Sequence, residues 1–317
     1  MKKLSATDNY MDHDVAYLLG MVVGRGSLTE SGDDRRLVID FPYRALQAKG
    51  VREKFDQPKR LKLAVYSIRD RIEQLVEADF DTNITRSRCQ FIIRFGRRNI
   101  SWRNLLVITE GNMNFRSSVV PKRILKAPKE IKKEFMRGVA DVCGFVRAAN
   151  HFHGRHRVYL EIPVQNWKLP VSLCHLLQAH MGVPVQMIQW NHPNTRIPNQ
   201  TDKKLTGREH QVKIFAEAFL GVGFYVEYKQ RILEELAELN KDYSPPKRCN
   251  PNPMVHQRKK KRKHPEENSS LIAENIRGRH FDGYYEICAE MGCQQFRPIA
   301  PDREILFDAD EEPHDAE

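Results

Sequence analysis

The sequence has no run of about 18 apolar residues, the length that a helix needs to cross a bilayer, so no membrane-spanning segment is expected. No apolar stretch precedes Tyr10, so no signal peptide is expected either. Cysteines are few: six are scattered along 317 residues. This pattern argues against a disulfide framework and favours reduced thiols in an intracellular protein, in the nucleus or in the cytoplasm or nucleoid.

Acidic residues are too few to balance the basic ones, and the formal net charge is +11. The stretch 302–317 is itself strongly acidic, so the rest of the chain is more basic than this total suggests. A basic surface favours a polyanionic partner, and nucleic acid is the first candidate. The alternative is a basic protein without such a partner.

Helix-like and strand-like patterns alternate between residues 14 and 240. Apolar spacing, capping residues and β-forming residues support each assignment. We predict helices over residues 14–21, 66–79, 101–111, 128–145, 170–182, 207–224 and 226–240, with Asp14 and Ser101 as N-caps, and strands over 36–43, 88–96, 156–165 and 183–190. The order of elements occurs twice, about 118 residues apart, which indicates an internal duplication of α+β class.

The duplication predicts the domain boundaries. We expect a first repeat over residues 1–120 and a second over 121–242. A basic, proline-containing extension with short helices follows over 243–301, and residues 302–317 form an acidic tail that we expect to be disordered.

Two glycine-containing stretches stand at equivalent places in the two repeats. "LLGMVVGRGSL" (residues 18–28) and "MRGVADVCGFV" (136–146) share glycines at their third and ninth positions. The first is not a dinucleotide fingerprint, because its third glycine is replaced by Thr29 and no strand precedes it. It is not a P-loop either, since no Gly-Lys-Ser/Thr follows. We predict instead two helices, the first ending in a glycine turn, whose small faces pack closely together. The expected interface residues are Gly20, Gly24, Gly138 and Val142.

These paired stretches resemble the motif helices of the single-chain, two-repeat LAGLIDADG homing endonucleases. The approach "VPKRIL...EIKKEFMRGVADVCGF" and the later "REHQVKIFAEAFLGVGFYVEYKQRILEEL" carry the same resemblance, which covers roughly residues 14–240. It implies two pseudo-symmetric αββαββα repeats that meet at the motif helices. It also implies a saddle of antiparallel sheets that binds duplex DNA. In this family, each motif helix ends in an acidic residue one place before the last motif glycine, and these two carboxylates bind divalent metal.

The motifs of this chain are degenerate at those two positions, which Arg25 and Cys143 occupy. An arginine is always cationic and repels a metal ion, and a cysteine is a poor ligand for Mg²⁺. We therefore expect no catalytic residue and no cofactor, and we expect Cys143 to be a packing residue. Arg25 is expected either to contact a phosphate or to lie solvated in the turn. Asp141 lies two residues before Cys143, about 200° around the helix, and should point elsewhere.

Three functions remain open from these residues. The first is a monomeric protein that binds duplex DNA in recognition or regulation and has lost cleavage. The second is an active Mg²⁺-dependent DNA endonuclease with relocated ligands, for which Asp141 is the fallback. The third is an RNA-binding splicing cofactor that resembles a maturase and binds structured RNA.

Basic and amide side chains near the predicted strands are the candidate DNA contacts. A two-stranded ribbon can read base edges while flanking cations hold phosphates, although strand arginines can also serve only for solubility. The candidates are Arg25, Arg36, Arg86, Arg88, Arg94, Arg97, Arg98, Arg155, Arg157, Gln165, Asn166 and Arg196.

The C-terminal extension adds two further hypotheses. The run "RKKKRK", with Lys259, Lys260 and Lys261, is a phosphate-binding arm, a nuclear-localisation signal or a solvated linker, and the extension is also a candidate site for a protein partner. Four residues form a weak zinc set, because their spacing is loose: Cys249, His256, Cys288 and Cys293. The competing interpretation places Cys288 on an apolar helix face.

Overall fold

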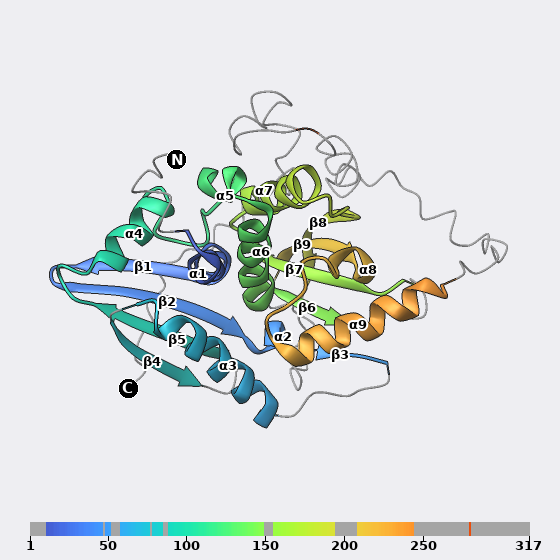
Figure 1. Ribbon diagram of the computed structural model, residues 1–317, viewed down its shortest axis with the longest axis horizontal. Helices are drawn as coiled ribbons and strands as arrows, with labels where there is room; N and C mark the ends of the chain where they lie inside the picture. The colour runs from blue at the N-terminus through green and yellow to red at the C-terminus, as the bar shows by residue number, and fades with distance from the viewer. Residues whose placement is uncertain are drawn as a thin grey trace, which may run out of the picture.

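A computed structural model describes residues 11–46, 48–51, 58–76, 78–84, 88–148, 155–193 and 208–243 and residue 279 (Figure 1). The first repeat contains α1 (His13–Arg25), β1 (Gly26–Ser31), β2 (Asp34–Pro42), α2 (Tyr43–Leu46), β3 (Ala48–Lys49), α3 (Pro58–Glu73), β4 (Asp79–Ile84), β5 (Arg88–Phe95) and α4 (Ile100–Ile108). No helix in these ranges is both long enough and apolar enough to span a bilayer.

The second repeat follows the same order with small additions. It contains α5 (Lys122–Lys126), α6 (Lys129–Cys143), β6 (Gly144–Arg147), β7 (Arg157–Pro163), α7 (Lys168–His175), the π-helical turn η2 (Leu176–His180), β8 (Met187–Pro193), β9 (Arg208–Phe215), α8 (Ala216–Phe219) and α9 (Glu227–Lys241). The predicted α+β class and the two αββαββα repeats are confirmed. Apart from Tyr243 and Arg279, the predicted C-terminal extension and the predicted acidic tail lie outside the described residues.

Each repeat builds one sheet, and the two sheets flank the central helices α1 and α6 (Figure 1). The strand order is β1-β2-β5-β4 in the first sheet and β3-β6-β7-β9-β8 in the second. All pairs are antiparallel except one. The exception is β3, which comes from the first repeat and pairs in parallel with β6, placing Ala48 opposite Val146. The first repeat therefore contributes an edge strand to the second sheet.

Helices α1 and α6 cross at glycines. A β-carbon added at Gly20 would lie 2.0 Å from the carbonyl oxygen of Phe135, and one added at Gly138 would lie 2.0 Å from that of Tyr17. Both distances are far inside van der Waals contact, so only glycine permits this approach of the two backbones. Helix α1 is buried on all sides from Ala16 to Arg25, which explains its nearly continuous apolar sequence.

The strands bury alternate residues against these helices. In β2, Leu37, Ile39 and Phe41 are fully buried, while the residues between them face away from the helices. In β9, Val212 and Ile214 are likewise fully buried. The residues between them lie on the opposite face of each sheet, which is partly exposed in β2, whereas Tyr159, Glu161 and Gln211 on the corresponding face of the second sheet are also buried.

Three predictions about the elements are wrong. The N-cap of α1 is Asp12, whose carboxylate accepts from the amide of Val15, and not Asp14. The cap of α4 is Asn99 and not Ser101. Residues 208–215, predicted as helix, form β9, because their apolar residues recur every second position.

Candidate nucleic-acid interface

The two motif helices end side by side, and each passes directly into a strand. Gly26 and Gly144 follow α1 and α6 with extended backbones, at φ −92°, ψ 143° and φ −90°, ψ 140°. The expected glycine turn after α1 is therefore wrong. The Cys143 thiol lies 3.4 Å from the Gly24 carbonyl oxygen, and a β-carbon at Gly24 would lie 2.8 Å from Val142. We call this meeting point of the two helix ends the seam.

Arg25 is buried at the seam and crosses to the second repeat. Its Nη2 donates to the Glu161 carbonyl oxygen at 3.0 Å and pairs with the Glu209 carboxylate at 3.2 Å. The alternative in which Arg25 lies solvated in the turn is wrong, because the side chain is buried and paired with Glu209; the phosphate contact stays a prediction. Arg25, the last residue of α1, therefore joins the two repeats by an ion pair.

Cys143 occupies the equivalent position of α6 and is also buried. Burial raises the pKa of its thiol to about 11, so the sulfur is protonated at neutral pH. A protonated thiol is neither a good nucleophile nor a metal ligand, because both roles require the thiolate. This environment fits a small packing residue.

Asp141 belongs to a different, fully buried cluster. Its Oδ2 accepts from the Tyr17 hydroxyl at 2.8 Å and from the Tyr225 amide at 3.1 Å, and Oδ1 lies 3.7 Å from the Lys229 ammonium. Burial raises the pKa of the Asp141 carboxyl. Its hydrogen bonds point into the protein, so Asp141 is not positioned to bind a metal ion against DNA.

Lys229 of α9 caps the C-terminal end of α6. Its ammonium is fully buried and donates to the carbonyl oxygens of Ala140, at 3.0 Å, and of Gly144, at 2.8 Å. A cation at a helix C-terminus satisfies carbonyls that have no partner in the helix. Burial nevertheless lowers the pKa of Lys229 to about 8. The cluster of Tyr17, Asp141 and Lys229 thus fixes the end of α6 against α9.

The first sheet presents a mixed outer face, on the side turned away from α1 and α6. We name it the first outer face. On β2 and β5, Arg36 pairs with Asp34 at 2.7 Å and Arg94 with Asp81 at 2.8 Å. Its members are Asp34, Arg36, Asp40, Asp79, Asp81, Asn83, Gln90 and Arg94. Among these residues, four are acidic and two are basic.

The second sheet presents a face of aromatic and cationic residues, which we name the second outer face. The rings of Phe145 and Tyr159 stack at 5.2 Å, and the Arg147 guanidinium lies 5.3 and 5.1 Å from their centroids. Arg157, opposite Arg147 in the ladder, donates to Gln186 at 2.5 Å. The members of this face are Phe145, Arg147, Arg157, Tyr159, Glu161, Gln189, Glu209, Gln211, Lys213 and Phe215.

The other candidate DNA contacts are divided between the surface and the undescribed segments. Arg97, Arg98 and Gln165 are exposed, and Arg155 forms an ion pair with Glu217. Arg88 lies in β5, but its side chain is not described. Arg86, Arg196, Lys259, Lys260, Lys261 and the zinc candidates Cys249, His256, Cys288 and Cys293 all lie outside the described residues.

Asn166 is wrongly predicted as a DNA contact, because its side chain is buried in the protein. Its amide donates to the carbonyl oxygens of Phe115, at 2.7 Å, and Ser118, at 2.9 Å, and its Oδ1 accepts from the Leu169 amide at 3.0 Å. It therefore ties the start of α7 to the connection between the repeats.

Asn166→Ala is expected to lower the free energy of unfolding by about 1–3 kcal/mol, because it leaves buried backbone groups without partners. Thermal unfolding measures this change. The control is Gln165→Ala at the exposed neighbouring residue, which is expected to alter stability by less than about 0.5 kcal/mol. Equal effects of the two substitutions would contradict this role of Asn166.

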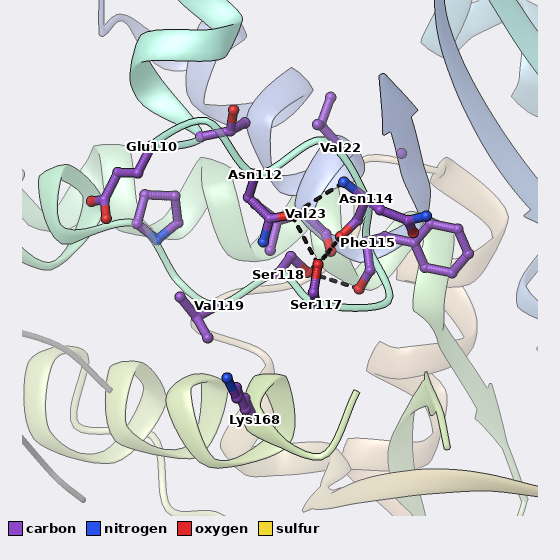
Figure 2. Close-up of a pocket in the computed structure, with 13 residues that line it drawn as sticks. Val22, Val23, Glu110, Asn112, Asn114, Phe115, Ser117, Ser118, Val119 and Lys168 are labelled. Carbon is purple, nitrogen blue, oxygen red and sulfur yellow. Dashed lines mark hydrogen bonds between the residues drawn. The ribbon is translucent and has the colours of Figure 1, made fainter. Parts of the chain in front are cut away.

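A cavity of about 140 Å³ lies between the connection of the repeats and the end of α1 (Figure 2). Its polar groups mostly bond to one another: Asn112 Oδ1 accepts from the Asn114 amide and the Ser117 hydroxyl, and Ser118 donates to Val23. Among the described residues, none of the buried side-chain atoms that lack a hydrogen-bond partner lines it. The cavity is part of the packing of the connection.

Sequence reasoning missed Glu209, Lys213, Lys229 and Arg147. The alternation of residues 208–215 could have identified the strand that carries Glu209 and Lys213. Lys229 falls on the apolar face of α9, three and four residues before Ile232 and Leu233, which is an unusual place for a lysine. Arg147 carries no comparable sequence signal, because its ring partner Tyr159 lies on another strand.

No family model and no curated protein matches the chain. Among solved structures, it is similar to I-DmoI crystallised with DNA and Ca, at 15% identity and a TM-score of 0.36, covering 68% of this chain and 93% of that one. It is also similar to full-length DUF199/WhiA from Thermatoga maritima, at 12% identity and a TM-score of 0.41, covering 77% and 64%. The N-terminal LAGLIDADG domain of DUF199/WhiA gives 9% identity and a TM-score of 0.36, covering 72% and 83%.

Proposed function

We propose that this chain binds duplex DNA with the outer faces of its two sheets and does not cleave it by metal-dependent chemistry. The observation that carries this proposal is the composition of the seam. An arginine neutralised by Glu209 ends one motif helix, and a protonated cysteine ends the other. The scaffold that presents two sheets is retained, whereas the groups that would hold a metal between them are replaced.

The residues at the seam do not fit Mg²⁺. This ion requires oxygen ligands, several of them anionic, in near-octahedral geometry. The carboxylate of Glu209 is engaged by Arg25, whose positive charge would repel a metal ion at the same place. Within the described ranges, no group of three or more His, Cys, Asp and Glu side chains is arranged to hold a metal. The relocated-ligand alternative requires Asp141, which is fully buried among its own partners.

Binding to DNA is supported by charge and shape. The net charge of +11 favours a polyanion, and cations lie on the second outer face at Arg147 and Arg157. Two antiparallel sheets on either side of one helix pair can each enter a major groove, which admits a β-ribbon and exposes distinguishable base edges. The amide side chains of Gln90 and Gln189 are of the type that reads such edges.

Selection of bound sequences from a random duplex pool, followed by a cleavage assay on the selected sites, tests this proposal. We expect salt-dependent binding of duplex DNA, and no more strand scission with Mg²⁺ or Mn²⁺ than with EDTA. Efficient Mg²⁺-dependent nicking of a selected site would overturn the loss of cleavage. If nicking occurs, Asp141→Asn shows whether that carboxylate takes part.

A competition assay distinguishes the RNA-binding hypothesis from duplex DNA binding. An excess of unlabelled structured RNA is expected to displace labelled duplex DNA less effectively than the unlabelled selected duplex does. Stronger displacement by RNA would contradict duplex DNA as the partner.

A further inference from the structure

The two outer faces differ in how their arginines are held, although their strands are equivalent in the two repeats. This difference concerns the surface of the proposed function and deepens it. The inference therefore depends on duplex binding, but the experiment below can contradict the inference without contradicting duplex binding.

On the first outer face, the two arginines whose side chains are described are held by carboxylates. Arg36 pairs with Asp34, and Arg94 pairs with Asp81, in both cases with partly exposed side chains. Asp79 stands opposite Arg94 in the strand ladder, which adds a second negative charge beside it. Each of these arginines thus brings a negative charge towards any phosphate that it approaches.

The adjoining part of the first outer face is a row of hydrogen-bonded polar groups. Asp40, Gln90 and Asn83 stand opposite one another on three strands. Gln90 donates to Asp40 at 2.7 Å and accepts from Asn83 at 3.4 Å. This row presents a carboxylate and amides, a composition that repels phosphates and suits hydrogen bonding to bases.

On the second outer face, the arginines are held by neutral groups. Arg147 rests on the rings of Phe145 and Tyr159, and Arg157 is bonded to Gln186 and lies 5.2 Å from the Phe215 ring. Among the described residues, no carboxylate forms an ion pair with either arginine. Aromatic rings and amides orient a guanidinium without cancelling its charge.

The two arginines are also close together. Arg147 and Arg157 are direct cross-strand partners. Lys213 lies on the same face, opposite Tyr159, which follows Arg157 by two residues in β7. Opposed residues of an antiparallel pair have β-carbons about 5 Å apart, so the two side chains can reach neighbouring phosphates. Glu209, on the same face, has its charge engaged by Arg25 at the seam.

We infer that the duplex is held unequally, with its phosphates bound mainly by Arg147 and Arg157 on the second outer face. The first outer face contributes little to the electrostatic part of binding, since its own carboxylates neutralise Arg36 and Arg94. The partner of this surface is the backbone of a DNA duplex. We expect the salt dependence of the affinity to come mainly from the second outer face.

The test compares two variants by the slope of log K against log salt concentration, on a selected duplex. Arg147→Gln combined with Arg157→Gln is expected to lower the magnitude of the slope by about 2, at about 0.9 per phosphate contact. Affinity should fall roughly tenfold per arginine. The fourfold change D34N, R36Q, D81N and R94Q removes both ion pairs at constant net charge and is expected to leave the slope unchanged.

A charge-matched control keeps the result interpretable. Lys126→Gln combined with Lys129→Gln removes two positive charges from exposed sites near the start of α6, far from its seam end, and should leave the slope nearly unchanged. Circular dichroism and thermal unfolding confirm that each variant is folded. Equal slopes for wild type and the Arg147, Arg157 variant would overturn the inference. The inference would also be overturned if the fourfold change lowered the magnitude of the slope as much as the Arg147, Arg157 double change does.

The proposed function fails by a different result. If the wild-type chain does not bind duplex DNA, duplex binding itself is wrong. If the wild type binds and the two faces contribute equally, only the unequal division between them is wrong.

Discussion

Gly138→Ala is expected to destabilise the protein by more than about 3 kcal/mol or to prevent folding. The added β-carbon would lie 2.0 Å from the Tyr17 carbonyl oxygen and 3.1 Å from the Met21 amide nitrogen, both backbone atoms of α1. Backbone cannot move aside as a side chain can, so the two helices would have to separate. The loss would exceed the usual cost of overpacking, about 1–3 kcal/mol, because the contact lies between fully packed elements. Urea unfolding measures this change in the free energy of unfolding.

The control for this prediction is Gly221→Ala. Gly221 is exposed after α8, and a β-carbon there would meet no atom within 4 Å. Alanine is intrinsically favoured over glycine in a helix by about 1 kcal/mol, so helix propensity alone would make Gly138→Ala stabilising. A Gly138→Ala variant as stable as the wild type would therefore show that the helices do not cross at this glycine.

The pairing of α1 and α6 could be predicted from the sequence because its cause is local. The glycines at 20 and 138 stand at the same place in two apolar stretches, and a repeated small residue on a helix face has few uses other than close packing. The position of the two motif ends follows from this pairing. Arg25 and Cys143 therefore come together at the seam, as their shared motif position implies.

The strands were harder to predict because their signals are short. β1 follows α1 without a turn, and "GSLTES" has a single large apolar residue, Leu28, which is buried. The alternation in β9 spans eight residues and merges with the short helix α8. In both cases, pairing with a neighbouring strand determines the structure, and that pairing is not local in sequence.

The partners of the charged residues could be predicted only where they are local in sequence, as for Arg36 and Asp34, which lie two residues apart in β2. Arg36 and Arg157 are both arginines at strand positions, yet one pairs with Asp34 and the other bonds to Gln186. Composition counts each as one positive charge. Whether that charge remains available to a phosphate depends on its partner, and Gln186, the partner of Arg157, is 29 residues away in sequence. The sequence alone therefore did not distinguish the two faces.

Lys229→Met is expected to lower the free energy of unfolding by about 3–5 kcal/mol at pH 7, the usual cost of removing one member of a buried pair. The substitution leaves the Asp141 carboxylate without its cation, and it leaves the carbonyl oxygens of Ala140 and Gly144 without their donor. Lys241→Met, at an exposed position of the same helix, is the control and should change stability by less than about 0.5 kcal/mol.

The pH dependence of this effect gives a second and sharper measurement. Burial lowers the pKa of Lys229 to about 8, whereas an unfolded lysine titrates near 10.4. Between these values the unfolded chain binds more protons than the folded one, so this group makes stability rise with pH. The methionine variant lacks the group, and the stability difference between wild type and Lys229→Met should therefore widen from pH 8 to pH 10. A constant difference across this range would mean that the Lys229 ammonium is not buried beside Asp141.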